Sequence, residues 1–239
     1  MKNEKYDISF VMPMYNESEN IEDTIGLIKG IASEISHEHE IVIVDDASTD
    51  DSAVKVEDIA RRDSKIKLFT MSENTRFGGA FAEAFKKAGK EIIVYMDSDL
   101  PVEREDIKAS VPLIENCHIV TGYSRINKGE NLARKILSRG YNLLVELFFG
   151  LRVRDINSGY KVVRKSLVED LDFVSRSPFV DVELFIHAKK KGYSVKQYPL
   201  VFRSRTGGVS HIARLPVILA TFRDMLRVKA RTWKKIPEK

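Results

Sequence analysis

Cysteine is almost absent from this sequence, and apolar runs long enough to span a membrane are absent altogether. Cys117 is the single cysteine in 239 residues, which excludes a disulfide framework and fits a reducing compartment. The longest apolar runs, Leu143–Leu151 and Leu215–Phe222, are shorter than the roughly 20 residues that a helix needs to cross a bilayer. The charged residues after Met1 lack the apolar segment of a cleaved signal. We therefore expect no transmembrane helix.

The common nucleotide-binding signatures are also missing. The sequence has no G-x-x-x-x-G-K-[ST] loop, and the glycine pair in Phe77–Ala80 does not follow the G-x-G-x-x-G pattern. These absences argue against a P-loop and against a Rossmann dinucleotide site. A nucleotide bound by this chain therefore needs another group, such as a divalent cation, to neutralise its phosphates.

Charge is unevenly distributed along the chain. The formal net charge is +4, yet ten lysines and arginines and only two acids lie between Arg203 and Lys239. Such an excess attracts anionic lipid headgroups or nucleic acid, although many basic helices are simply solvated. No aromatic residues alternate with base-reading side chains, and Trp233 is the only tryptophan. We therefore expect no nucleic-acid partner and keep a membrane surface as a candidate.

The first half of the chain alternates short apolar runs with helical stripes. Ser18 is the expected cap of the first helix. Strands that are apolar on both faces and joined by helices indicate an α/β fold with a doubly wound, mostly parallel sheet. The expected strands are residues 8–13, 40–48, 65–70 and 91–97, and the expected helices are residues 17–35, 49–62 and 78–89.

After Pro101 the pattern becomes looser. An amphipathic helix is expected over residues 131–151, either continuous or broken near Gly140. We expect this part of the chain to wrap one side of the N-terminal unit. Its other expected elements are strands over residues 117–124 and 157–165, a helix over residues 181–192 and an extended segment over residues 193–205.

Polar clusters follow three of the expected strands. Pro13–Glu17 follows the first strand, Asp45 and Asp46 end the second, and Asp97 and Asp99 end the fourth. Ligands of open α/β sheets bind at the carboxyl ends of the strands, so we expect these side chains on one edge. Two carboxylates one residue apart repel each other and lose solvation unless a cation offsets the cost. We therefore favour a Mg²⁺ or Mn²⁺ site over a simple loop or helix cap.

Taken together, four motifs resemble a known family. "FVMPMYNESENI", "IVIVDDASTDDS", "YMDSDLP" and "RDINSGYKVVRK" occur in this order, as in the inverting family 2 glycosyltransferases of GT-A fold. Within that family, "KILSRGYN" and "FRSRTGGVSH" are similar to the polyprenyl (dolichyl) phosphate sugar synthases. The likeness extends to about Ile212. It implies transfer of a sugar from GDP-mannose or a UDP-sugar to a polyprenyl or dolichyl phosphate, with Mg²⁺ or Mn²⁺.

The resemblance also implies a donor site. It places a metal on Asp97 and Asp99, and it gives Arg205 a catalytic role beside the phosphates or the acceptor. Pro101 stands where the family often has glutamine, and His211 stands where it often has lysine. The residues implied in donor nucleotide binding are Pro13, Tyr15, Glu17, Asp45, Asp46, Asp97, Ser98 and Asp99.

An acceptor site is expected on the expected helix over residues 131–151. Arg134 and Ser138 are four residues apart and share a helical face, and Arg125 precedes the helix. Arginine suits a phosphate because its planar fork binds two oxygens at once. Arg139 is the second-ranked candidate because it lies off that face. A phosphate acceptor is already anionic near pH 7, so the reaction needs no general base.

The resemblance implies one GT-A domain over residues 1–239. We expect a nucleotide-sugar-binding half at 1–122, an acceptor-binding half at 123–212 and a basic tail at 213–239 with interfacial helices. The protein is then peripheral, at the cytoplasmic face of a membrane. Two alternatives stay open: a family 2 glycosyltransferase with another acceptor, such as a glycan or lipid, and a non-catalytic membrane-surface scaffold. A phospho-acceptor receiver domain fits poorly, because its paired acids follow the first strand.

Overall fold

A single seven-stranded sheet forms the centre of the molecule. The computed structural model describes residues 6–99, 102–125, 132–201 and 215–233. The strands lie in the order β3-β2-β1-β4-β6-β5-β7. Their bounds are β1 (Tyr6–Met14), β2 (Ser36–Asp45), β3 (Ile66–Thr70), β4 (Ile92–Met96), β5 (Ile119–Ser124), β6 (Tyr160–Arg164) and β7 (Val195–Leu200).

Most strand pairs in this sheet are parallel. β1 pairs in parallel with β2 and β4, β2 pairs in parallel with β3, and β5 pairs in parallel with β7. β6 is the exception, since it runs antiparallel to both β4 and β5. The expected α/β fold with a mostly parallel sheet is therefore confirmed, and β6 joins the part built before Pro101 to the part built after it.

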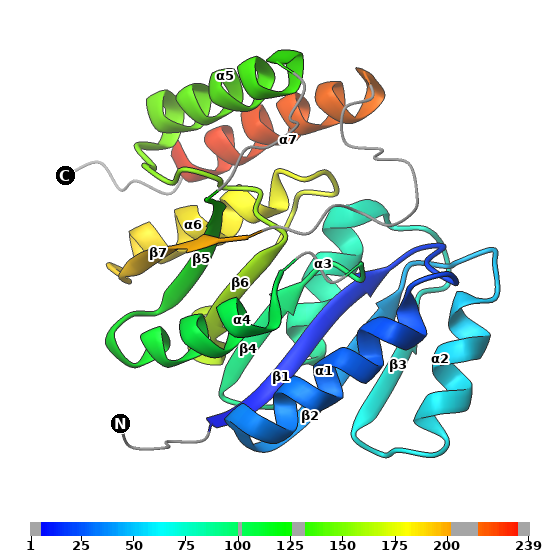
Figure 1. Cartoon of the computed structure of the whole chain (residues 1–239). Helices are drawn as coiled ribbons and strands as arrows, with labels where there is room; N and C mark the ends of the chain where they lie inside the picture. The colour runs from blue at the N-terminus through cyan, green and yellow to red at the C-terminus, as the bar shows by residue number, and fades with distance from the viewer. Residues whose placement is uncertain (1–5, 100–101, 126–131, 202–214, 234–239) are drawn as a thin grey trace.

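Helices cover both faces of the sheet (Figure 1). Residues of α1, α2 and α4 form one apolar cluster with one face, and residues of α3, α5, α6 and α7 form a second cluster with the other. The bounds are α1 (Ile21–Ile35), α2 (Ser52–Ala60), α3 (Arg76–Lys87), α4 (Arg104–Ser110), α5 (Leu132–Phe149), α6 (Val180–Lys190) and α7 (Leu215–Trp233), with 3-10 turns at η1 (Val111–Asn116) and η2 (Lys165–Leu167).

Strand β4 explains how the two clusters are separated. All five of its residues are buried. Ile92, Val94 and Met96 pack in the first cluster, whereas Ile93 and Tyr95 pack in the second. Successive side chains of a strand point to opposite faces, so a run that is apolar throughout forms a strand covered on both sides.

The starts of β2 and α1 differ from the sequence-based expectation, whereas α5 has one of the two forms expected for it. β2 begins at Ser36, not at residue 40. Asn20, not Ser18, occupies the N-cap position of α1, and it makes no side-chain capping hydrogen bond. The Ser18 N–H instead donates to Asp50 Oδ2 at 3.2 Å. α5 is continuous through Gly140, because an isolated glycine weakens a helix without ending it.

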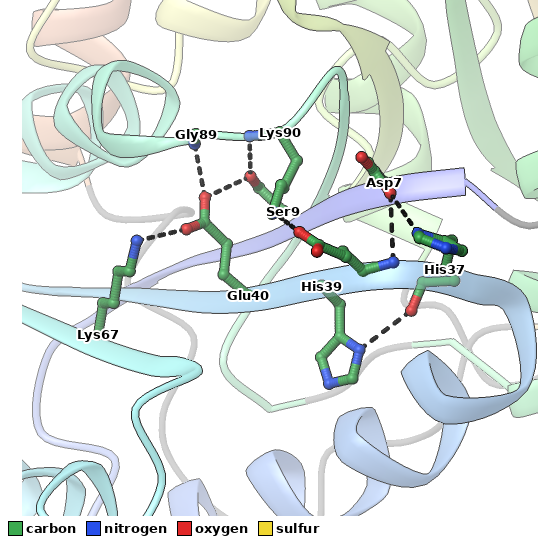
Figure 2. Close-up of polar contacts among 10 residues, drawn as sticks. Asp7, Ser9, His37, His39, Glu40, Lys67, Gly89 and Lys90 are labelled. Carbon is green, nitrogen blue, oxygen red and sulfur yellow. Dashed lines mark hydrogen bonds and ion pairs between the residues drawn. The ribbon is translucent and has the colours of Figure 1, made fainter.

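Glu40 links the strands at the end of the sheet opposite to the candidate site (Figure 2). Its carboxylate accepts hydrogen bonds from the Ser9 hydroxyl and Lys67 Nζ, both at 2.6 Å, and from the Gly89 N–H at 2.5 Å. Burial alone raises the pKa of Glu40, but the bonds from Lys67, Ser9 and Gly89 together outweigh it and lower the pKa. One carboxylate thus ties β1, β2, β3 and the turn before β4 together.

Helices α5 and α7 lie side by side (Figure 1), and several apolar side chains of both helices are exposed. Lys229 of α7 donates to the Phe148 carbonyl, and its ammonium lies 5.4 Å from the centre of the Phe149 ring. Within the described part of the chain, no helix is long and apolar enough to cross a membrane. The exposed apolar residues of this pair, here called the α5–α7 face, are Leu143, Leu144, Leu147, Leu215, Leu219, Phe222 and Leu226.

Candidate active site

The loops that follow β1 and β2 are bonded to each other. Asn16 adopts a positive φ of 56° at the end of β1. Its N–H donates to the Ser48 hydroxyl at 3.0 Å, and its Oδ1 accepts from the Thr49 N–H at 2.8 Å. The next residue, Glu17, donates its N–H to the Ser52 hydroxyl at 2.8 Å. This pairing leaves the Tyr15 side chain 45% exposed at the edge of the sheet.

Two buried aspartates end β2. Asp45 and Asp46 are 1% and 3% exposed. Asp45 Oδ1 accepts from the Ser48 N–H at 3.1 Å, and Asp46 Oδ1 accepts from both the N–H and the hydroxyl of Thr75. Burial raises the pKa of Asp46, although the bonds from Thr75 oppose the rise. These carboxylates shape the loops around the edge, and the nucleotide-binding role that the resemblance implies for them stays a prediction.

Asp97 is held by hydrogen bonds at its side chain and at its backbone. The Tyr95 hydroxyl donates to Asp97 Oδ1 at 2.9 Å, and the Asp97 N–H donates to the Gly159 carbonyl at 3.1 Å. Burial raises the pKa of Tyr95 far above its usual range, and the negative charge of Asp97 raises it further. Tyr95 is therefore a neutral donor that fixes the orientation of the Asp97 carboxylate before any ligand arrives.

Ser98 and Asp99 continue this edge. Ser98 is 5% exposed, and its carbonyl accepts a hydrogen bond from the Thr24 hydroxyl of α1 at 2.9 Å. Asp99 is half-buried. Thr24 therefore fixes the short segment between the two acids against α1. Pro13, the remaining residue of the implied donor site, is half-buried in β1.

The side chains at this edge fit a divalent cation that is shared with a phosphate. No group of three or more His, Cys, Asp or Glu side chains arranged for a metal occurs among the described residues. Mg²⁺ normally takes one or two carboxylates and completes its octahedron with water and substrate phosphates. Asp97 and Asp99 supply that number of carboxylates, so the donor set suits a metal that binds together with a diphosphate.

A buried ion pair near Asp97 was missed by the sequence-based reasoning. Lys161 Nζ lies 2.6 Å from Asp181 Oδ1, and the two side chains are 0% and 2% exposed. Burial raises the pKa of Asp181 to about 6, Lys161 opposes the rise, and Asp97 adds to it. The available signal was a lysine between the apolar residues Tyr160 and Val162 of β6.

The residues expected to bind the acceptor are only partly within the described structure. Arg125 is exposed beyond β5, and its N–H donates to the Leu200 carbonyl at 2.8 Å. Ser138 and Arg139 are exposed on α5. The side chain of Arg134 lies outside the described residues, although its backbone belongs to α5. Three further residues named from the sequence also lie outside the described residues, namely Pro101, Arg205 and His211.

A cavity of about 490 Å³ lies at the other end of the strands. It is lined by Tyr6, His37 and Arg164, among others. Two of these residues stand at the start of β1 and β2 and the third at the end of the antiparallel β6. Since ligands of open α/β sheets bind at the carboxyl ends of the parallel strands, we place the candidate site at the edge that holds Asp97 and Asp99.

The profile of one protein family matches most of the chain. The glycosyl transferase family 2 profile covers residues 9–172, which includes most of β1 and all of β2 to β6. The chain belongs to glycosyl transferase family 2. This confirms the resemblance seen in the sequence, and it places the chain in a family of enzymes that transfer sugars.

Curated relatives are longer than this chain. The chain is 26% identical over 203 residues to glycosyltransferase AglD of Haloferax volcanii, covering 81% of the chain and 32% of the relative. It is 26% identical over 206 residues to the undecaprenyl-phosphate 4-deoxy-4-formamido-L-arabinose transferase of Yersinia pestis, covering 81% of the chain and 63% of the relative. The chain thus spans about a third of the first protein and somewhat under two thirds of the second.

Solved structures share the fold. Glucosyl-3-phosphoglycerate synthase of Mycobacterium tuberculosis in complex with phosphoglyceric acid aligns with a TM-score of 0.70 and 22% identity, over 98% of this chain and 82% of that one. The same enzyme with Mn²⁺ and UDP-glucose aligns with a TM-score of 0.69 and 21% identity, over 98% and 81%. The GT-A-type fold expected from the resemblance is therefore confirmed.

Proposed function

We propose that this chain transfers a sugar from a nucleotide diphosphate sugar to a polyprenyl phosphate at a membrane surface. The main support is the pair Asp97 and Asp99 at the carboxyl end of β4, within a chain of glycosyl transferase family 2. A relative named as an undecaprenyl-phosphate sugar transferase supports the acceptor. The structural neighbour that holds Mn²⁺ and UDP-glucose supports a metal and a nucleotide sugar.

The proposed donor site lies between the ends of β1, β2 and β4. Asp97 and Asp99 would hold a divalent cation, which would supply positive charge to stabilise the leaving nucleotide diphosphate. Tyr95 orients the first of these carboxylates through its hydroxyl. The exposed Tyr15 ring offers a surface for the base, with Glu17, Asp45 and Asp46 as polar neighbours.

The remaining residues of the donor site are assigned in the same way. They are Pro13 of β1 and Ser98, which stands between the two metal-binding acids. Arg205 is proposed to act at the phosphates or at the acceptor, from outside the described residues. In this assignment the donor half of the domain covers residues 1–122, the acceptor half covers residues 123–212, and the basic tail covers residues 213–239.

The proposed acceptor site lies next to α5. Arg125, Arg134 and Ser138 would bind the phosphate of the acceptor, with Arg139 as a further candidate. A polyprenyl phosphate already has anionic oxygens at neutral pH, so one of them attacks the sugar directly and no side chain has to remove a proton. The arginines then hold the attacking group in place, which is a positioning role.

The α5–α7 face is the surface proposed to lie on the membrane. Leu147 and Leu219 are 70% and 61% exposed, on two helices that contact each other. Arg223 and Arg227 are exposed on α7 beside these apolar residues. Apolar side chains flanked by cations suit a helix in the headgroup layer, where anionic lipids attract the cations. A lipid-linked acceptor would be reached from this surface, at the cytoplasmic face.

A substrate panel tests the proposed function. The purified chain would be incubated in detergent with a polyprenyl phosphate, MnCl₂ and GDP-mannose, UDP-glucose or a UDP-N-acetylhexosamine, and products would be identified by mass spectrometry. We expect a glycosyl polyprenyl phosphate with one donor and no product with Asp99→Ala. Transfer only to a glycan or to a lipid without phosphate would show a family 2 enzyme with another acceptor. No metal-dependent binding of any donor would favour a non-catalytic scaffold.

A further inference from the structure

The lysine of the buried ion pair belongs to the central sheet. Lys161 stands in β6 and pairs with Tyr95 of β4 on one side and with Thr121 of β5 on the other. Val163, two residues further on the same face, packs in the apolar cluster beneath α3 and α6. The alternation of the strand therefore predicts an apolar residue at position 161, and the sequence places a lysine there.

A fully buried lysine is unusual, because an apolar residue packed in the same place would stabilise the core at least as well. Replacing a buried ion pair with apolar residues of similar volume is often neutral or stabilising, whereas removing one partner alone is strongly destabilising. Asp181 and Lys161 lie 2.6 Å apart with almost no exposure to solvent. Stability alone therefore does not explain why both groups are present.

The Lys161 ammonium contacts two segments that are themselves bonded to Asp97. Lys161 Nζ donates to the Ser158 carbonyl at 2.5 Å, and the adjacent Gly159 carbonyl accepts the Asp97 N–H at 3.1 Å. Lys161 Nζ also lies 5.4 Å from the centre of the Tyr95 ring, whose hydroxyl donates to Asp97 Oδ1 at 2.9 Å. The ammonium thus contacts the residue next to Gly159, which bonds the Asp97 backbone, and the ring of Tyr95, which bonds the Asp97 side chain.

Asp181 fixes the ammonium in that place. It stands in the first turn of α6, where the helix N-terminus favours a negative charge. With the lysine bonded to both Asp181 and the Ser158 carbonyl, its position is set by α6 and by the segment before β6. An ammonium that is fixed on one side by a carboxylate offers a rigid support to the tyrosine ring on the other.

We propose that Lys161 and Asp181 are positioning residues that hold Asp97 ready for a divalent cation and its diphosphate. This inference rests on the proposed function only in that Asp97 is taken as a metal ligand. Neither residue of the pair touches the metal or the substrate. Their effect passes through Tyr95 and through the Ser158–Gly159 segment, so losing the pair should loosen Asp97 without removing any ligand.

The test separates positioning from stability by replacing the whole pair. The variant Lys161→Met/Asp181→Leu replaces the buried ion pair with apolar side chains, so we expect a melting temperature near that of the wild type. Tyr95→Phe removes only the hydroxyl that orients Asp97. Binding of Mn²⁺ in the presence of UDP or GDP would be measured by calorimetry and by the electron paramagnetic resonance signal of free Mn²⁺.

We expect the double variant and Tyr95→Phe each to bind Mn²⁺ about tenfold more weakly than the wild type, a change of about 1.4 kcal/mol. The matched control is Lys67→Met, which breaks the 2.6 Å ion pair with Glu40 far from the site and should leave Mn²⁺ affinity unchanged. Wild-type affinity in a folded double variant would overturn the inference and leave the proposed function standing. Absence of Mn²⁺ binding by the wild type would overturn both.

Discussion

Asp46 Oδ1 accepts two hydrogen bonds from a single residue, Thr75, whose N–H lies at 2.6 Å and whose hydroxyl lies at 2.7 Å. Thr75 is the residue before α3. One buried carboxylate oxygen therefore fixes the start of α3 against the end of β2. The loop that borders the proposed nucleotide site is set by this contact.

Removing the Asp46 carboxylate should destabilise the fold. In Asp46→Ala both Thr75 donors lose their acceptor, so we expect a loss of about 1–3 kcal/mol in the free energy of unfolding. Asp46→Asn keeps one acceptor oxygen and should lose less. Urea denaturation measures both, with Asp58→Ala as the control, since Asp58 forms an exposed pair with Arg61 and its loss should change little. Equal stability of all three variants would contradict this account.

Glu40 should make the stability of the protein sensitive to acid. The pKa of Glu40 is lower in the folded protein than the usual value of 4.5, because the bonds from Lys67, Ser9 and Gly89 outweigh the effect of burial. A lowered pKa of an acid contributes stability above its unfolded pKa, and this contribution is lost as the pH falls through the folded value. We therefore expect the wild type to lose stability below about pH 4.5.

Glu40→Gln isolates this effect. The variant should be less stable at pH 7 and should show a flatter dependence of unfolding free energy on pH between about pH 5 and pH 3. Glu57→Gln is the matched control, because Glu57 forms an exposed pair with Arg61. Parallel pH profiles for Glu40→Gln and the wild type would rule out Glu40 as a source of the acid sensitivity.

Loss of one metal-binding carboxylate should abolish sugar transfer with the fold intact. In Asp99→Ala the diphosphate loses the cation that compensates its charge, so we expect no measurable turnover and an unchanged far-ultraviolet circular dichroism spectrum. EDTA should have the same effect on the wild type, and added Mn²⁺ should restore its activity. Full activity of Asp99→Ala in EDTA would end the metal hypothesis.

A charge in the α5–α7 face should weaken binding to membranes. Wild-type protein should sediment with liposomes that contain anionic lipid at low salt, and Leu147→Asp or Leu219→Asp should reduce the bound fraction at least several-fold. Val54→Asp is the control, because Val54 is 57% exposed on α2 and stands outside this face. If the wild type stays in the supernatant at low salt, the face does not bind lipid.

The arginines next to α5 should affect the acceptor and not the donor. Each charged hydrogen bond to a phosphate contributes about 1.5–3 kcal/mol, so Arg125→Ala and Arg134→Ala should each slow transfer about tenfold or more at subsaturating polyprenyl phosphate. Donor affinity, measured by calorimetry, should stay within about twofold. Arg61→Ala on α2 serves as the control. Wild-type rates in both acceptor variants would refute the assignment.

The sequence indicated the fold well where the signal is local. Ile92–Met96 is apolar throughout, and this pattern correctly indicated a strand buried on both faces. Asp97 and Asp99 also give a local signal, because a pair of acids directly after an apolar run is unusual. Family motifs then made the interpretation specific, and the family profile confirmed it.

Other features depend on contacts between residues far apart in the chain. Nothing in Tyr160–Arg164 shows that this strand runs antiparallel between β4 and β5, because pairing order has no local pattern. The first helix starts at Ile21, and the Ser18 N–H before it bonds to Asp50 in the loop after β2. The sequence does not show that Lys161 forms a buried ion pair, because its partner, Asp181, belongs to a different element. Local propensity gives way to tertiary contacts at each of these places.

The antiparallel insertion of β6 has a consequence for how the protein folds. β4 can pair with β1 once residue 96 has been made, but it gains its other neighbour only when Tyr160–Arg164 has been made as well. The β4–β6 pairing also closes a long stretch of chain, which costs entropy before the contacts form. The Asp97 N–H finds the Gly159 carbonyl in that same step. The edge that holds Asp97 is thus completed only after β6 has been made, so we expect a growing chain to bind a divalent cation poorly until its sheet is complete.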